Sequence, residues 1–177
     1  MKKLLILALL FSAHTVLAQD YCKQIKKDIT ENNTNFNCET PYNEDAPPLV
    51  RAVRSYSTDP KNDFDNFNLI LSIPCEFADL LTNGPNGEVE KEEVGVIIEF
   101  SDKSKIEEPS IAVTHDKKGD GSAVRVAYLP IDGDNVIDFT KKKIVKIQLA
   151  KTTANVPDDM ATAMQKYMAC LRDAKKI

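Results

Sequence analysis

The chain contains no tryptophan, only 2 histidines and only 6 glycines among its 177 residues. The missing tryptophan removes the usual platform for stacking sugars, although 5 tyrosines remain. So few glycines leave little material for a glycine-rich loop that cradles phosphate, and the sequence has no such motif. After the leader described next, no hydrophobic run reaches the roughly 20 residues that a membrane-spanning helix needs. These shortages argue against nucleotide-binding and membrane-spanning classes.

The N-terminus has the pattern of a cleavable secretory signal peptide. A Lys-Lys pair precedes the apolar run Leu4–Phe11, and Val16-Leu17-Ala18 suits signal peptidase. The run is too short to span a membrane, and the residues before Cys22 are not those of a lipoprotein cleavage site. The pattern resembles bacterial leaders. The sequence therefore predicts a cleaved signal peptide over residues 1–18 and a single exported domain over 19–177, periplasmic or secreted, with no transmembrane anchor after cleavage.

The charge balance of the mature part is acidic. The whole chain has 23 basic and 27 acidic residues, and the leader contains 2 of the lysines and no acid, which leaves a net charge near −6. A negative surface favours solubility and opposes binding to nucleic acid. The acidic run Glu88–Glu93 is expected to be a solvated loop rather than a docking site. Another protein or an extracellular ligand is therefore the expected partner.

Four cysteines lie in the mature part: Cys22, Cys38, Cys75 and Cys170. An even number in an oxidising compartment favours two disulfides, and the wide spacings exclude a CxxC redox pair. The favoured pairing joins Cys22 with Cys38 and Cys75 with Cys170, because a helix and a turn after Cys22 would return the chain past its own start. Each bridge is expected to stabilise the fold by about 2–4 kcal/mol.

Hydrophobic spacing predicts the order helix, strands, helix. Tyr21, Ile25 and Ile29 recur at helical spacing within 20–31, and apolar Met and Leu side chains recur in the same way after Pro157. The segments expected to be strands are 49–57, 67–73, 94–100, 110–115, 123–129, 136–139 and 143–149.

The expected fold class is α+β. Strands that follow one another without intervening helices favour a mainly antiparallel β-sheet or a sandwich-like core of six to seven strands. The N-terminal and C-terminal helices are expected to pack on it, with the Met-rich stripe Met160, Met164, Tyr167, Met168 and Leu171 facing the sheet rather than lining a ligand groove.

The sequence contains few residues in patterns typical of catalysis. His115 is the single histidine of the mature part, and nearby Ser122 is not in a G-x-S-x-G motif, so His115 is expected to be an ordinary surface residue. Two acidic loops, 132–138 and 59–68, contain residues of the calcium-binding type. Counted as EF-hands, both place a hydrophobic residue (Val136 or Phe67) at the fifth position, so both are expected to be turns. The sequence predicts no catalytic, cofactor-binding or metal-ligating residue.

Three function classes remain. An exported, non-enzymatic binding or interaction module is favoured, because the chain combines a leader, a β-rich domain and charged loops without a catalytic motif. The alternatives are a small exported hydrolase that uses His115 or a carboxylate pair, and an inhibitory or structural subunit of a secreted complex.

Overall fold

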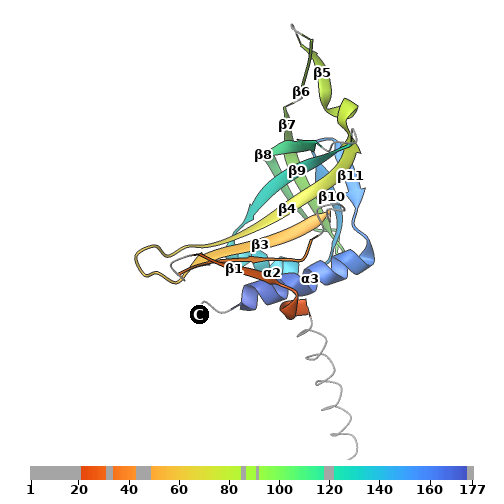
Figure 1. Ribbon diagram of the computed structural model, residues 1–177. Coiled ribbons are helices and arrows are strands. Elements are labelled where there is room, and N and C mark those ends of the chain that lie inside the picture. The colour runs from red at the N-terminus through yellow and green to blue at the C-terminus, as the bar shows by residue number, and fades with distance from the viewer. Residues whose placement is uncertain are drawn as a thin grey trace, which may run out of the picture.

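The computed structural model describes residues 21–30, 34–42, 49–84, 87–90, 92–117 and 122–174. Within these residues the chain forms a large antiparallel sheet with helices on one side, as Figure 1 shows. The α+β class is therefore confirmed. The predicted signal peptide and its cleavage site lie outside the described residues.

The described part of the chain contains eleven strands. They are β1 (Lys26–Ile29), β2 (Asn35–Glu39), β3 (Val50–Ser57), β4 (Asp65–Glu76), β5 (Leu81–Gly84), β6 (Gly87–Glu90), β7 (Glu93–Phe100), β8 (Lys105–Lys117), β9 (Ser122–Ile131), β10 (Ile144–Leu149) and β11 (Thr152–Asn155). The helical elements are the 3-10 helix η1 (Phe77–Leu80) and the α-helices α2 (Gly133–Lys141) and α3 (Asp158–Asp173).

Nine of these strands form one open sheet in the order β1-β2-β3-β4-β9-β8-β7-β10-β11, and β5 and β6 form a separate hairpin. The sandwich-like core and the count of six to seven strands are thus not confirmed. The sheet is curled. Strand β4 contacts β10 and β11, although these strands stand four and five places away from it in the sheet order. In Figure 1 the β5–β6 hairpin extends from one end of the molecule, and α2 and α3 lie at the other.

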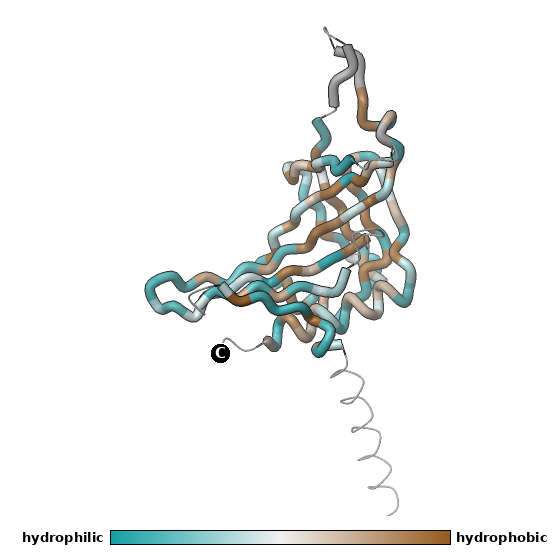
Figure 2. Tube along the Cα trace, in the orientation of Figure 1, coloured by the Kyte–Doolittle hydropathy of each residue, from teal (hydrophilic) through white to brown (hydrophobic). Residues whose placement is uncertain are grey.

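The core fills the concave side of the curled sheet, against α2 and α3. Because successive side chains of a strand point to opposite faces, every second residue of the central strands enters this core. Leu69, Leu71 and Ile73 of β4 are buried there. They lie next to Ala127 and Leu129 of β9. Figure 2 shows the hydrophobic segments running along the central strands. A smaller buried group of Ile70, Val124 and Val126 packs with Val53 elsewhere in the fold. None of the helices that the structure describes is long and apolar enough to cross a membrane.

Several elements were predicted from hydrophobic spacing. Strands β3, β4, β7, β8, β9 and β10 overlap the expected segments, and β8 and β9 pair as the expected hairpin. In α3, the stripe residues Met164, Met168 and Leu171 are 5 %, 1 % and 0 % exposed and Met160 packs against the core that contains them, so the prediction that the stripe packs in the core is confirmed for these four residues. Tyr167 instead contacts the ring of Tyr21.

The predicted N-terminal helix over 20–31 is wrong. Within the described part of this range, 21–30, Tyr21–Lys23 are helical and Lys26–Ile29 form β1, which pairs with β2 at the sheet edge. Ile25 packs against the core, but Ile29 is 53 % exposed, so the isoleucines do not form one buried helical face. Pairing with β2 has overridden a weak helical pattern.

The short strand expected at 136–139 is also wrong, because this segment belongs to α2. Asp132 occupies the N-cap position of the helix. Val136 and Phe139 are each 1 % exposed and lie three residues apart on the same helical face, where Phe139 packs edge-to-face on Phe100 at 5.2 Å between ring centroids. In so short a segment, helical and strand spacing of two apolar residues are difficult to distinguish.

Candidate functional site

A cavity of about 640 Å³ lies between the N-terminal strands and the C-terminal helix. Its walls come from the segment before β1, from β1, β2 and β3, and from the last turns of α3 and the residue after it. The lining residues are Cys22, Ile25, Lys27, Cys38, Tyr56, Lys166, Ala169, Cys170, Asp173 and Ala174. Cys22, Lys27 and Asp173 are exposed, whereas Cys38 and Tyr56 are 2 % and 0 % exposed, so the cavity extends from the surface to the core.

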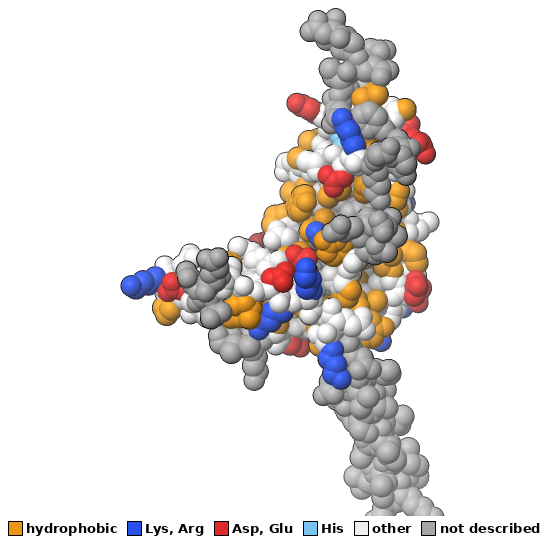
Figure 3. All heavy atoms as spheres, viewed as in Figure 1, with side chains coloured by type: hydrophobic (Ala, Val, Ile, Leu, Met, Phe, Trp, Pro, Cys, Tyr) orange, Lys and Arg blue, Asp and Glu red, His pale blue; other side chains and the backbone are white. Residues whose placement is uncertain are grey.

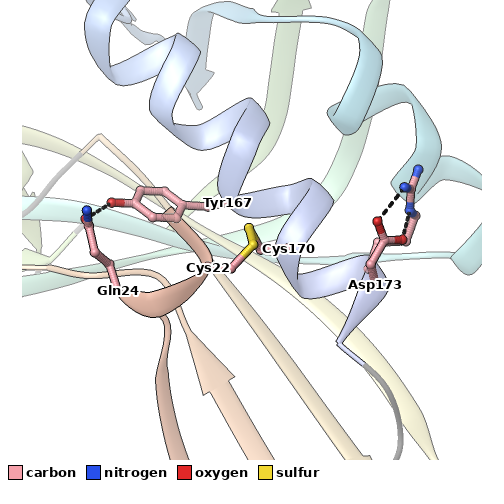
Figure 4. Close-up of a disulfide and its surroundings, with 6 residues drawn as sticks. Cys22, Gln24, Tyr167, Cys170 and Asp173 are labelled. Atoms are coloured by element: carbon pink, nitrogen blue, oxygen red, sulfur yellow. Dashed lines mark hydrogen bonds and ion pairs between the residues drawn. A yellow bond between two sulfur atoms is a disulfide. The ribbon is translucent and has the colours of Figure 1, made fainter. Parts of the chain in front are cut away.

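A disulfide closes one wall of this cavity. It joins Cys22 to Cys170 on α3, across 148 positions of the sequence (Figure 4). Beside it, the hydroxyl of Tyr167 donates a hydrogen bond of 2.6 Å to Oε1 of Gln24, and the rings of Tyr21 and Tyr167 meet edge-to-face at 5.2 Å between centroids. The N-terminal turn is therefore held to α3 by a covalent bond, a hydrogen bond and an aromatic contact.

The expected pairing of the cysteines is wrong. The structure joins Cys22 to Cys170 and leaves Cys38 and Cys75 as free thiols. The error follows from the N-terminal segment, because the predicted helix and returning turn, which would have brought Cys22 to Cys38, are replaced by a short turn and an edge strand.

Thiol counting tests this arrangement. We expect alkylation of the denatured, unreduced protein to modify two cysteines, Cys38 and Cys75, and alkylation after reduction to modify four. Intact mass gives the number and peptide mapping gives the positions. Complete protection of all four cysteines before reduction would mean that the chain contains two disulfides and would contradict the structure.

A row of cross-strand neighbours faces the cavity and α3. Cys38 of β2 lies opposite Lys27 of β1 on one side and opposite Arg54 of β3 on the other. Directly opposed residues of antiparallel strands project from the same face of a sheet. Burial raises the pKa of the Cys38 thiol above its ordinary value, although the positive charges of Lys27 and Arg54 act in the opposite direction. Cys38 is therefore mainly a neutral thiol near pH 7.

Arg54 fixes the end of α3 beneath the sheet. Its Nη1 donates to the carbonyl oxygens of Leu171, Arg172 and Ala174 at 2.6, 3.0 and 2.8 Å. Its Nε and Nη2 bond the two carboxylate oxygens of Asp65 at 2.9 and 2.8 Å. The last carbonyl groups of a helix have no partner within the helix, so this buried guanidinium satisfies them and balances their partial negative charge.

A second polar cluster lies where β7, β8 and β9 run side by side. Nε2 of His115 is 3.2 Å from Oε2 of Glu93, and Nε of Arg125 donates to the same oxygen at 2.8 Å. The side chains of His115, Glu93 and Arg125 are 4 %, 14 % and 7 % exposed. Burial alone would raise the pKa of Glu93, but the hydrogen bonds and charges of Arg125 and His115 outweigh it and hold this pKa below its ordinary value.

Two sequence-based expectations about this cluster are wrong. His115 is not an ordinary surface residue, because its side chain is buried against Glu93. The run Glu88–Glu93 is not simply a solvated loop, because Glu88 and Glu90 belong to β6 and Glu93 begins β7 and pairs with Arg125. Half-buried Cys75 lies close by, and burial raises the pKa of its thiol although the nearby Arg125 lowers it.

The two acidic loops considered for calcium have separate structures. Residues 133–138 form the first turns of α2, and the 59–68 segment contains a turn followed by the start of β4. In that turn, Oδ1 of Asp59 accepts a hydrogen bond of 2.9 Å from the backbone of Lys61, which is ordinary turn chemistry. Among the residues that the structure describes, no three His, Cys, Asp or Glu side chains lie close enough together to hold a metal ion.

Comparison with known proteins returns no similar sequence or structure. No family model matches the chain, no curated protein is significantly similar to it, and no solved structure shares its fold at a significant level.

On the face seen in Figure 3, basic and acidic side chains of the described residues are interspersed.

Proposed function

We propose that this protein is an exported binding module whose cavity holds a small apolar molecule with an acidic group. The observation that carries the proposal is the cavity of about 640 Å³ with two lysines among mainly apolar walls. Ligand-binding cavities typically have volumes of about 300–1,000 Å³ and combine apolar walls with a few polar groups. The disulfide in the wall supports export, because such bonds persist in oxidising compartments.

The charges of the cavity favour an anion. Lys27 and Lys166 contribute two ammonium groups, which lie 4.7 Å from the ring centroid of Phe36 and 4.5 Å from that of Tyr21, respectively. Asp173, the one carboxylate among the described lining residues, already bonds Arg172 through both oxygens at 2.7 and 2.9 Å. The local balance is therefore positive, and each lysine can donate to a carboxylate or sulfonate at the mouth of the cavity.

The walls favour an apolar body for the ligand. Ile25, Ala169 and the Cys22–Cys170 bridge contribute carbon and sulfur surface, and the ring of Tyr56 lies at the buried end. A molecule with an aliphatic chain and one terminal acid would place the chain along these walls and the acid near the lysines. Burial of apolar surface then drives binding, at about 25 cal/mol per Å² before the cost of association.

Binding of dodecanoate by the intact exported protein tests the proposal. We expect dodecanoate to displace the fluorescent anion 1-anilinonaphthalene-8-sulfonate, and dodecyltrimethylammonium, which has the same chain and the opposite charge, to displace it poorly. Removing one charge with Lys27→Met or Lys166→Met should weaken dodecanoate binding roughly 10–100-fold, because each charge-assisted hydrogen bond contributes about 1.5–3 kcal/mol. Lys61→Met is the matched control, because Lys61 is exposed on the turn after β3 and does not line the cavity, and it should leave binding unchanged.

Filling the cavity provides a separate test. Ala169 is half-buried on α3, and Ala169→Phe should abolish binding while the far-UV circular dichroism remains that of the unaltered protein. Equal binding of the anionic and cationic amphiphiles, or unchanged binding in Ala169→Phe, would refute the proposal.

A further inference from the structure

We propose that Cys38 exchanges with the Cys22–Cys170 disulfide inside the cavity, forming a Cys38–Cys170 bridge and releasing Cys22 as a reactive surface thiol. The inference rests on the three sulfur-bearing residues that line one cavity, a free thiol and both halves of a disulfide. It does not depend on the identity of any ligand.

The fold brings Cys38 of β2 and Cys170 of α3 to the walls of the same cavity. Cys38 lies directly opposite Arg54 in the β2–β3 register, so the two side chains share one face of the sheet. Arg54 in turn donates a hydrogen bond of 2.6 Å to the carbonyl oxygen of Leu171, the residue that follows Cys170. The Cys38 thiol and both halves of the bridge therefore line one cavity, on the side of the sheet where Arg54 meets the end of α3.

The exchange is balanced without an external oxidant or reductant. The Cys38 thiolate attacks Sγ of Cys170, the new Cys38–Cys170 bond forms as the Cys22–Cys170 bond breaks, and the electron pair leaves on Sγ of Cys22. The proton lost by Cys38 is replaced at Cys22 from solvent. Cys22 is the favoured leaving group because it is exposed, whereas Cys170 is half-buried, so water can stabilise the departing thiolate.

The exchange would change how the C-terminal helix is anchored. Before it, α3 is tied to the N-terminal turn, and after it, α3 is tied to β2 within the sheet. Cys22 would then lie exposed near the N-terminus, where it can form a mixed disulfide with a thiol-bearing partner. The bridge thus has a second arrangement that converts a structural cysteine into a reactive one.

The rate of exchange should depend on pH. The charged and titratable groups around Cys38 are Lys27 and Asp28 of β1, Arg54 and Tyr56 of β3, and Lys166 and Asp173 of α3. Burial raises the pKa of Cys38 against the effect of Lys27 and Arg54, so the thiolate is scarce near neutrality. Because only the thiolate attacks, the rate should rise about tenfold per pH unit below the pKa of Cys38.

The test follows the bridges of the oxidised, exported protein under native conditions. Cys75→Ser removes the other free thiol, and iodoacetamide traps released thiols during incubation between pH 7 and 9, without added reductant. We expect carboxamidomethylated Cys22 and a Cys38–Cys170 peptide to accumulate together, faster at higher pH and at a rate independent of protein concentration. The control Cys75→Ser/Cys38→Ala should retain the Cys22–Cys170 bridge throughout.

Three results would overturn the proposal. The first is an intact Cys22–Cys170 bridge with alkylated Cys38 after prolonged incubation at pH 9. The second is labelling of Cys22 at the same rate in the control that lacks Cys38. The third is a Cys22–Cys38 peptide with alkylated Cys170, which would mean that the opposite sulfur is attacked. Because no ligand is involved, failure here would leave the proposed binding function untouched.

Discussion

Arg54→Met is expected to destabilise the protein by about 3–5 kcal/mol, because it breaks a part-buried ion pair with Asp65 and also leaves carbonyl groups at the end of α3 without their donor. Arg54 is 6 % exposed and makes five hydrogen bonds, two to Asp65 and three to carbonyl oxygens at the end of α3. Methionine would fill much of the space beside Phe67, whose ring centroid lies 4.8 Å from the guanidinium carbon, but would leave these acceptors without their donor.

The measurement is urea unfolding at pH 7, with the midpoint and slope determined for each variant. Arg51→Met on the same strand is the matched control. Arg51 is partly buried (21 % exposed), lies 3.9 Å from Glu39, beyond hydrogen-bond distance, and stacks on the ring of Tyr42 at 4.3 Å, so we expect a loss of only about 1 kcal/mol. A loss from Arg54→Met no larger than that from Arg51→Met would contradict the role assigned to Arg54.

The same substitution should also affect the cavity. Asp173 and Ala174 form part of its wall, and both follow the helix turn whose carbonyl groups Arg54 holds. We therefore expect Arg54→Met to weaken dodecanoate binding even under conditions where the variant remains folded. Arg54→Met would then lower both the free energy of unfolding and the affinity for dodecanoate.

The elements of the fold that could be predicted from the sequence are those whose own residues carry a hydrophobic pattern or a turn motif. Strands β4 and β7 and helix α3 were predicted because their apolar residues keep one period over a long segment, and β8 and β9 were predicted from the turn residues between them. Strand β1 carries no such signal, because all four of its residues are exposed and it is held by pairing with β2 alone. A strand defined only by its neighbour has no sequence signature of its own.

The residues of the candidate sites could not be brought together from the sequence for a related reason. Cys22 and Cys170 are separated by 148 positions, and no local pattern states that the N-terminal turn and the C-terminal helix meet. The cluster around Glu93 joins residues 22 and 32 positions apart on three strands. The expected β8–β9 hairpin placed His115 beside β9, but pairing of β7 with β8 was needed to bring Glu93 to it.

Glu93→Gln is expected to destabilise the protein by about 3–5 kcal/mol at pH 7, because it leaves the buried guanidinium of Arg125 without a counter-charge. Glutamine has nearly the same shape, so the loss would report the charge rather than a cavity. Glu99→Gln on the same strand is the control, since Glu99 pairs at 3.3 Å with Lys103, which is 82 % exposed, and should contribute no more than about 1 kcal/mol.

The effect of Glu93→Gln should disappear in acid. The pKa of Glu93 is lower in the folded state than the ordinary value of 4.5, so its stabilisation is fully present above that value and is lost as the pH falls through the folded pKa. Urea unfolding from pH 7 to pH 3 should therefore show a constant gap between Glu93→Gln and the unaltered protein down to about pH 4.5, and a narrowing gap below it. A gap that stays constant to pH 3 would mean that the loss does not come from the charge of Glu93, and it would contradict the stabilising ion pair with Arg125.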